Sequence, residues 1–341
     1  LSRQRLRDVI DSGRHVGLSS RQRYNVPLMH TMKAIRVNET GGPEVLCYED
    51  VPRPEPEANQ ALVKIDYAGV NFIDVYFRTG VYKAPQMPFA LGKEGAGVVT
   101  AIGPGTDRFK VGDRIAYNGV AGSYAEEVGV AADKAVKIPD TIDDHTAAAI
   151  MLKGMTAEYL LRRTFKVGQE TVLLFHAAAG GVGLIAGQWA KHLGATVIGT
   201  AGSPEKCELA LQNGYDHVIN YRDADFVEKV REITDGRKCD VVYDSVGKDT
   251  FPGSLDCLKA RGLWVSFGQS SGNVPPFDIG ILNQKGSLFA TRPSLFGYNT
   301  SRDELDASAK ALFDVVGSGA VKITIGQTYP VAEAAQAHRD L

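Results

Sequence analysis

The period of apolar positions changes near Lys153. Before it, short apolar segments alternate with turns rich in Gly and Pro, and these segments lie at 34–37, 61–70, 97–103 and 113–117. After it, apolar runs of strand length recur at 172–175, 196–200, 217–219, 241–244, 263–267 and near 287–290. Helical spacing separates these runs, at 182–193, 204–212, 225–234 and 251–259.

Continuously apolar strands that alternate with helices indicate a parallel sheet covered on both faces, and the earlier segments indicate a β-rich domain. Beyond about residue 293 the pattern is mixed, with a helix near 302–317, a strand near 321–325 and a further helix. We therefore predict an α/β chain: a doubly wound parallel-sheet domain at 153–292, inserted into a β-rich domain formed by 32–152 and 293–341.

Residues 1–31 differ from the rest of the chain. They hold six Arg, no Lys and two Asp, without an apolar run long enough for a signal peptide. Two interpretations stay open: an Arg-rich transit peptide, or an expression scar or translated upstream sequence before a start at Met32. We favour the second, because a strand-like pattern begins at Met32. The last residues, 335–341, have the pattern of a helix that is cut short, and two interpretations stay open: the terminus was trimmed, or further residues follow Leu341.

Composition and charge narrow the class of protein. The 341 residues are 44% hydrophobic and 23% charged, with a formal net charge of −2, which is typical of a globular protein and speaks against a nucleic-acid partner. No apolar run approaches the roughly 18 residues of a membrane span. The four cysteines form no CxxC pair, which indicates a reducing, cytoplasmic compartment.

The segment Ala178–Gly183, which we call the glycine turn, lies between a predicted strand and a predicted helix. Its sequence AAGGVG has the form G-x-G-x-x-G with Ala178 in place of the first glycine. Small residues let a pyrophosphate approach the backbone at the positive end of a helix, and they allow close contact of helix and sheet. Because the motif heads a series of strand–helix units, we predict a dinucleotide site rather than a plain tight turn. The predicted contacts are Ala179, Gly180, Gly181, Val182 and Gly183.

The end of the second strand indicates which dinucleotide binds. An NAD site usually has an acidic residue there, but this strand ends in Thr200, Ala201, Gly202 and Ser203. Lys206 follows it, and Tyr221 follows the third strand. We predict that Lys206 and Tyr221 hold a 2′-phosphate, with Gly202 and Ser203 as further cofactor contacts, and hence that the cofactor is NADPH. Glu205 leaves open an alternative contact to the ribose.

Several motifs together resemble one family. GGPEVL, AGVNFIDVYFRTGVY, LGKEGAGVV, MLKGMTAEYLL, HAAAGGVGLIAGQWAKHLGA and TRPSL are similar to the zinc-independent NADPH:quinone oxidoreductases, the zeta-crystallin-like branch of the medium-chain dehydrogenase/reductase superfamily, bacterial type. The resemblance runs from Met32 to the last residue. It implies a GroES-like catalytic domain, a Rossmann domain, NADPH and a homodimer paired through sheet edges.

The same resemblance implies that no metal is bound. Zinc-dependent relatives have a Cys where this chain has Asn71 and a His where it has Lys93. A catalytic zinc needs about three N, S or O ligands, and this set is lost. His176 beside the glycine turn is expected to have a structural role rather than that of a catalytic base.

Without a metal, the substrate itself must be electron-poor, which favours quinones reduced by hydride (or single-electron) transfer. By the resemblance, Asn71, Tyr76 and Thr156 line the nicotinamide and substrate cleft, although Tyr76 and Phe72 also suit core packing. Further cofactor contacts implied at sheet ends are Ser245, Phe267, Gly268, Ser270, Ala290 and Thr291. Two alternatives stay open: an alkenal, enone or enoyl-thioester reductase, and, least favoured, a non-enzymatic structural or RNA-binding role.

Overall fold

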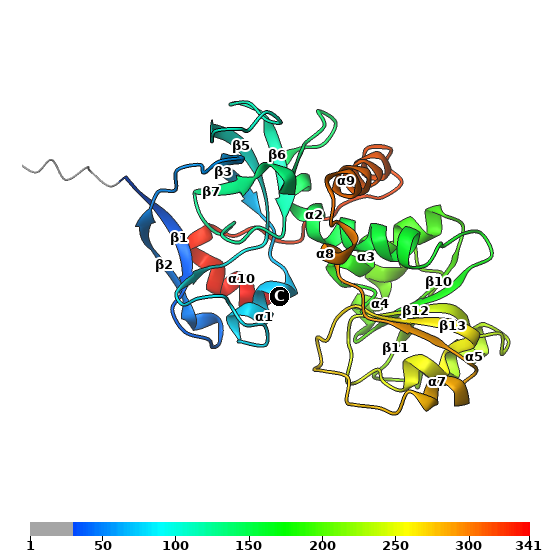
Figure 1. The fold of residues 1–341 in the computed structure, drawn as a ribbon. Helices are drawn as coiled ribbons and strands as arrows, with labels where there is room; N and C mark the ends of the chain where they lie inside the picture. Colours follow the sequence, from blue (N-terminus) through cyan, green and yellow to red (C-terminus); the bar gives the residue numbers. More distant parts are fainter. Residues whose placement is uncertain (1–29) are drawn as a thin grey trace, which may run out of the picture. The chain divides into compact units, whose positions relative to one another are not determined.

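The computed structural model describes residues 30–341, so the two interpretations of the N-terminal segment lie almost wholly outside the described residues. Thr31–Leu341 forms one compact unit with three sheets (Figure 1). Within this part of the chain, no helix is both long and apolar enough to cross a bilayer.

The largest sheet is parallel and has the order β11-β10-β9-β12-β13-β14. Its strands are β9 (Val172–Phe175), β10 (Thr196–Ala201), β11 (His217–Asn220), β12 (Cys239–Asp244), β13 (Leu258–Ser266) and β14 (Phe289–Thr291). Numbered along the chain, this order is 3-2-1-4-5-6, which is that of the Rossmann fold. The predicted doubly wound sheet is confirmed.

Helices cover both faces of this sheet: α3 (Gly181–His192), α4 (Pro204–Leu211), α5 (Phe226–Ile233), α6 (Gly253–Asp256) and α7 (Gly280–Gln284). Leu173 is buried in one core cluster with Trp189 of α3, whereas Leu174 is buried in another with Val230 of α5. Successive strand residues point to opposite faces, so both faces of the sheet are buried. This burial of both faces explains the continuous apolar runs in the sequence.

The β-rich part has two antiparallel sheets, with the orders β2-β1-β4 and β7-β3-β5-β6-β8. Its strands are β1 (Thr31–Val37), β2 (Leu46–Pro52), β3 (Gln60–Ala68), β4 (Phe89–Ala90), β5 (Glu94–Ile102), β6 (Arg114–Asn118), β7 (Glu127–Ala131) and β8 (Ala135–Lys137). Its helical segments are η1 (Pro43–Val45), α1 (Phe72–Arg78), η2 (Ala132–Lys134), η4 (Val331–Glu333) and α10 (Ala334–Asp340). A Cβ at Gly97 would lie 1.9 Å from the carbonyl oxygen of Lys64, so β3 and β5 approach closely only with glycine there.

Helix α2 (Asp144–Tyr159) contacts strands β5 and β6 of the β-rich part and helix α3, which covers the parallel sheet. It also contacts α9 (Arg302–Gly317). It continues into a π-helical turn, η3 (Leu160–Thr164). The predicted boundary at 152/153 falls inside α2, and the limits of the two domains stay a prediction.

Two local predictions are wrong. The helix expected at 251–259 is reduced to Gly253–Asp256, because Pro252 has no N–H and restricts Phe251, and Leu258 already pairs with β12. No strand forms at 321–325 within the described chain. There the amide of Gln188 takes the place of a partner strand, since its Oε1 accepts from the Lys322 N–H (2.9 Å) and its Nε2 donates to the Lys322 carbonyl (3.0 Å).

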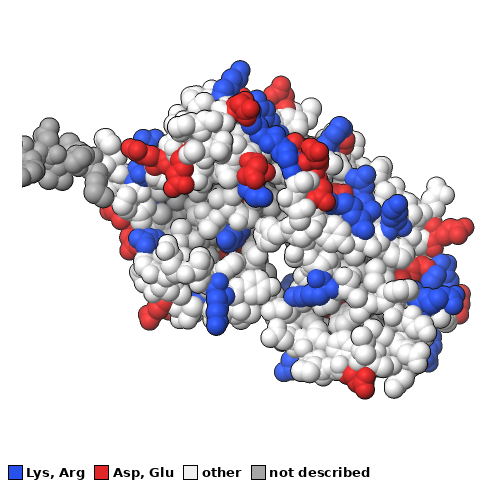
Figure 2. Space-filling model, viewed as in Figure 1, with Lys and Arg blue, Asp and Glu red and all other residues white. Residues whose placement is uncertain are grey.

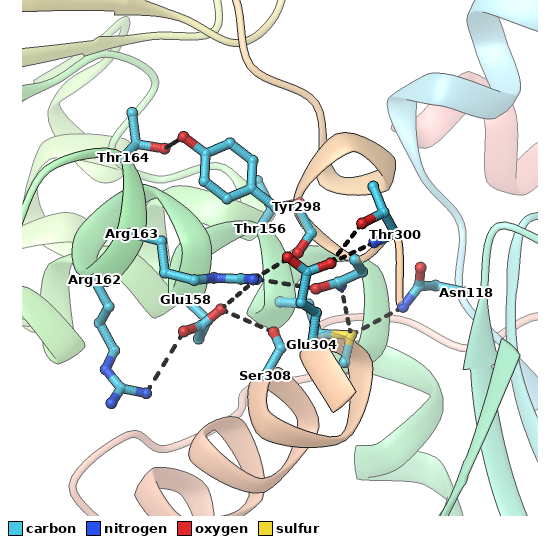
Figure 3. Close-up of polar contacts among 12 residues, drawn as sticks. Asn118, Thr156, Glu158, Arg162, Arg163, Thr164, Tyr298, Thr300, Glu304 and Ser308 are labelled. Carbon is cyan, nitrogen blue, oxygen red and sulfur yellow. Dashed lines mark hydrogen bonds and ion pairs between the residues drawn. The ribbon is translucent and has the colours of Figure 1, made fainter. Parts of the chain in front are cut away.

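A buried polar cluster joins α2 to α8 (Leu295–Tyr298) and α9 (Figure 3). Glu158 of α2 is 3% exposed, accepts from the Ser308 hydroxyl (2.9 Å) and pairs with Arg163 (2.8 Å). Arg163 also donates to the Tyr298 carbonyl (2.6 Å) and to Asn299 Oδ1 (3.0 Å). Arg162 reaches the other Glu158 oxygen at 3.5 Å from a more exposed position.

Removing the Arg163 guanidinium should therefore destabilise the fold. Arg163→Ala is expected to lower the free energy of unfolding by about 3 kcal/mol, because the buried Glu158 carboxylate loses its main partner. Arg162→Ala is the matched control and should cost less than about 1 kcal/mol, because the Arg162 side chain is exposed to solvent and Glu158 keeps Arg163 as its partner. Denaturant titration of both variants measures the difference, and equal losses would contradict the assignment.

Candidate functional site

The glycine turn lies between β9 and α3, as predicted. Gly180 is the N-cap of α3, no side chain caps it, and Ala177 has a φ of +56°. The first N–H groups of any helix have no intrahelical partner, so the start of α3 offers donors and a positive dipole end. A Cβ at Gly183 would lie 2.5 Å from the carbonyl oxygens of Ala177 and Ala178, which makes Gly183 the packing glycine of the motif.

Gly181 has a different neighbour from the one that the sequence suggests. A Cβ placed there would lie 2.7 Å from Cδ of Lys153 on α2. A side chain at Gly181 would thus meet the stem of Lys153 before any phosphate. The turn still suits a pyrophosphate at the helix N-terminus, formed by Ala179–Gly183.

The ends of β10 and β11 bring Gly202 and Tyr221 together. Ala201 and Asn220 are register partners, and a Cβ at Gly202 would lie 2.4 Å from the Tyr221 hydroxyl oxygen. Tyr221 is 52% exposed, and Lys206 is exposed in the first turn of α4. Ser203 caps that helix by accepting from the Lys206 N–H at 3.3 Å. The predicted pair therefore lies at one sheet end, where the Tyr221 ring packs against the backbone of Gly202.

Ser245, Phe267, Gly268 and Ser270 lie at the ends of β12 and β13. The Ser270 N–H donates to the Ser245 carbonyl at 3.1 Å, and a Cβ at Gly268 would lie 2.6 Å from that carbonyl oxygen. These loops are fixed by the buried Asp244, which accepts from the N–H of Val246 (2.9 Å) and of Gly247 (3.0 Å).

The predicted contacts Ala290 and Thr291 lie on the edge strand β14, where they pair with Trp264 and Val265. Arg292, which follows them, donates to the carbonyls of Ser266 (2.9 Å) and Gly268 (2.8 Å). It therefore holds the end of β14 against the loop after β13.

His176 has the structural role that the sequence favours. It is 1% exposed, and its ring nitrogens lie 2.9 Å from Thr200 Oγ1 and 3.1 Å from Ser254 Oγ. Burial lowers its pKa below the ordinary value, although Asp244 opposes this. A neutral ring tied to two hydroxyls stabilises the sheet end beneath the glycine turn.

Asn71 lies at the start of α1 and is 3% exposed. Its side-chain amide donates to Glu94 Oε2 at 2.7 Å and to the Gly69 carbonyl at 3.2 Å. Glu94 is fully buried and also accepts from the Leu152 N–H (2.7 Å) and from Lys153 Nζ (3.3 Å). Lys153 thus links the glycine turn to the residue that holds Asn71.

Tyr76 and Thr156 are oriented by different partners. The Tyr76 hydroxyl oxygen accepts from the Gln269 N–H at 3.3 Å, which brings α1 to the loop after β13. Burial raises the pKa of Tyr76, so its phenol stays protonated at neutral pH. The Thr156 hydroxyl donates within α2 to the Leu152 carbonyl at 2.7 Å.

Sequence reasoning missed Glu94, Lys153 and Arg292. The signal for Glu94 was its place beside Lys93 in GKEGAG, since a carboxylate inside an apolar strand segment needs donors when buried. Lys93 itself points elsewhere, with Nζ 4.8 Å from the Phe77 ring centroid, and burial lowers its pKa. Among residues 30–341, no group of three His, Cys, Asp or Glu side chains is placed to hold a metal ion.

A cavity of about 610 Å³ borders Lys153 and Gly181 from another side. Most of its other walls come from the end of β3, residues 124–126, helices α2 and α3, and the segment 322–331 with α10, and none of the predicted residues at the ends of β10–β13 lines it. Gly181 is thus the predicted cofactor contact that lines it, and the cavity adjoins the glycine turn but not the other predicted contacts.

Comparison with known proteins identifies the family. Residues 57–140 match the alcohol dehydrogenase GroES-like domain, and residues 181–319 match the zinc-binding dehydrogenase family. A quinone oxidoreductase of Pseudomonas aeruginosa is 51% identical over 310 residues, 91% of this chain and 95% of the relative. A 2-haloacrylate reductase of a Burkholderia species is 44% identical, over 89% and 93%.

A solved structure agrees with these relatives. The crystal structure of Escherichia coli quinone oxidoreductase complexed with NADPH superimposes with a TM-score of 0.89 at 49% identity, over 90% of this chain and 95% of that one. The chain therefore belongs to the quinone oxidoreductase family, in the zinc-independent, zeta-crystallin-like branch of the medium-chain dehydrogenase/reductase superfamily.

Proposed function

We propose that the protein reduces quinones with NADPH, without a metal. The observation that carries this proposal is that two sites lie in one compact unit. The first is the glycine turn, with Lys206 and Tyr221 at neighbouring strand ends. The second is formed by Asn71 and Tyr76 of α1, and Tyr76 contacts the loop after β13. Identity near 50% with quinone oxidoreductases supports it. So does the NADPH complex of one relative, whose fold this chain shares.

The cofactor fits the geometry of the residues present. The free N–H groups at the start of α3 would hold the pyrophosphate, and Lys206 with the Tyr221 hydroxyl would hold the 2′-phosphate. The loops at Ser245, Phe267, Gly268 and Ser270 would receive its middle part, and Ala290 and Thr291 its carboxamide. When bound, NADPH supplies the hydride.

The remaining residues orient the acceptor and exclude water, which is the contribution that a protein makes to cofactor chemistry. Asn71 is held rigidly through Glu94, and Tyr76 through the Gln269 N–H. Thr156 turns its hydroxyl into its own helix, so we assign it a packing contact with the nicotinamide. Water protonates the product.

An acceptor series tests the activity. With NADPH, quinones should give a higher kcat/KM than an enone, 2-chloroacrylate or an enoyl thioester, because a quinone needs no Lewis acid. Zinc should be well below one equivalent per chain, and a chelator should leave turnover unchanged. A preference for 2-chloroacrylate would favour the alternative reductase, to which one relative points. Cofactor binding without turnover of any acceptor would favour a non-enzymatic role.

Cofactor choice can be tested at Lys206. Lys206→Ala should weaken NADPH binding by roughly 10- to 150-fold, the worth of a hydrogen bond to a charged group, and leave NADH binding nearly unchanged. Lys310→Ala, an exposed lysine on α9, is the control and should change neither dissociation constant. An equal loss for both cofactors would show that Lys206 supports the fold or the shared ribose, and a wild type that prefers NADH would contradict the proposal.

We further propose a homodimer paired through β14, in the cytoplasm, with no nucleic-acid partner. In the described chain β14 pairs with β13 alone, and Phe289 and Ile279 near this edge are 61% and 76% exposed. An unpaired, apolar edge strand is a template for another strand.

The four free cysteines suit a reducing compartment such as the cytoplasm. Acidic and basic side chains are interspersed on the face shown in Figure 2, which does not favour a nucleic-acid partner.

Placing a charge on this edge should separate the subunits. Phe289→Glu is expected to shift the sedimenting species from about twice the chain mass of 36.7 kDa to the chain mass. Leu211→Glu, which alters a 43% exposed apolar side chain on α4, should leave the dimer intact. A Phe289→Glu protein that stays dimeric would place the interface elsewhere.

A further inference from the structure

Asp74 is a fully buried carboxylate in the first turn of α1, one turn after Asn71. Its Oδ2 accepts from the Asn71 backbone N–H and from the Tyr124 hydroxyl, both at 3.0 Å. Its Oδ1 has no hydrogen-bond partner in the described chain. Asp74 therefore holds the backbone of Asn71, while Glu94 holds its side chain.

A directed chain of donors ends at Asp74. Arg78 Nη1 lies 3.1 Å from His338 Nδ1 on α10. Because a guanidinium only donates, Nδ1 accepts and the His338 proton lies on Nε2. That nitrogen lies 3.3 Å from the Tyr124 hydroxyl oxygen, which is thus left to donate its own proton to Asp74. Burial and Arg78 lower the pKa of His338 to about 4, so the ring stays neutral.

Charged side chains from two neighbouring parts of the chain act on Asp74. Lys153 of α2 favours its charged form, and Glu94 of β5 opposes it. Burial lowers the pKa of Lys93, which directly precedes β5, and the Asp74 carboxylate partly offsets this. Burial outweighs the donors and raises the pKa of Asp74 to about 7. The group is thus poised between its two forms at neutral pH.

We propose that Asp74, Tyr124 and His338 are positioning residues that fix α1, and through it Asn71, for binding of the electron acceptor. The inference rests on the proposed function for its acceptor, but the ordering of α1 can be measured without turnover. The proposal links the site to α10, because His338 on α10 is hydrogen-bonded to Arg78 of α1 although the two residues are 260 positions apart.

The sign of the pH dependence follows from linkage. A carboxyl group whose pKa is raised in the folded state stabilises that state fully below its ordinary pKa of 3.8, and this contribution is lost as pH rises to the folded-state value of about 7. Wild-type α1 should therefore open more readily, and the KM for a quinone should rise, as pH rises towards 7, and both should level off above it. Asp74→Asn carries no titratable proton, so this dependence should be absent from it.

The decisive variant is Tyr124→Phe, which removes a donor to the carboxylate but keeps the ring. It should move the pH at which this dependence levels off upward by roughly 1 unit, and raise the quinone KM roughly 3- to 10-fold, the worth of one hydrogen bond. The dissociation constant of NADPH should not change. The matched control is Tyr117→Phe, since the Tyr117 hydroxyl is buried without a partner in the described chain.

Two measurements across pH 5–9 carry the test: hydrogen–deuterium exchange of residues 71–78, corrected for the intrinsic rate, and the quinone KM. His338→Gln can still accept from Arg78 and donate to Tyr124, so it should behave like wild type, whereas His338→Leu should behave like Tyr124→Phe. If Tyr124→Phe and His338→Leu matched the Tyr117→Phe control in both measurements, the proposal would be wrong. If exchange followed the expectation but no quinone were reduced, the positioning of α1 would stand and the proposed function would fall.

Discussion

A carboxylate taken out of water must be surrounded by donors, and much of this molecule is arranged around one such group. Glu94 has no exposed surface, and an ion without partners there would cost several kcal/mol. Its donors come from three places: the amide of Asn71, the N–H of Leu152 and the ammonium of Lys153. Meeting the needs of one charge therefore fixes β5, the start of α1 and the middle of α2 together.

Helix α2 transmits this constraint to the cofactor side. Lys153 places its ammonium beside Glu94 and its stem beside Gly181. Five residues later, Glu158 joins the same helix to α8 and α9 through Arg163 and Ser308 (Figure 3). Helix α2 thus contacts both the Glu94 that holds Asn71, on the acceptor side, and the glycine turn assigned to the pyrophosphate. That arrangement suits hydride transfer, which depends on holding two reactants in fixed geometry.

Local signals in the sequence were enough to predict the doubly wound sheet and the position of the glycine turn. The strand at 172–175 is apolar at every position because both faces of the sheet are covered, and Gly183 is required by the close carbonyls of Ala177 and Ala178. Interactions between distant segments could not be predicted in the same way. The bond from Asn71 to Glu94 joins residues 23 apart, and the approach of Lys153 to Gly181 depends on tertiary packing. The false strand at 321–325 has the same origin: Gln188, 134 positions earlier, binds a backbone that would otherwise need a strand.

The π-helical turn at Leu160–Thr164 continues helix α2 and sets the direction in which the side chains at its C-terminal end point. A π turn holds one residue more than an α turn over the same length, and each residue of an α-helix turns the chain by about 100°. Deleting a single residue there would restore regular winding and rotate everything after it by that angle. The guanidinium of Arg163 would then swing away from Glu158 and from the Tyr298 carbonyl. In evolution, length changes at this point would be selected against even where the amino acids exchanged are similar, because the phase of the helix, rather than its composition, determines the contact.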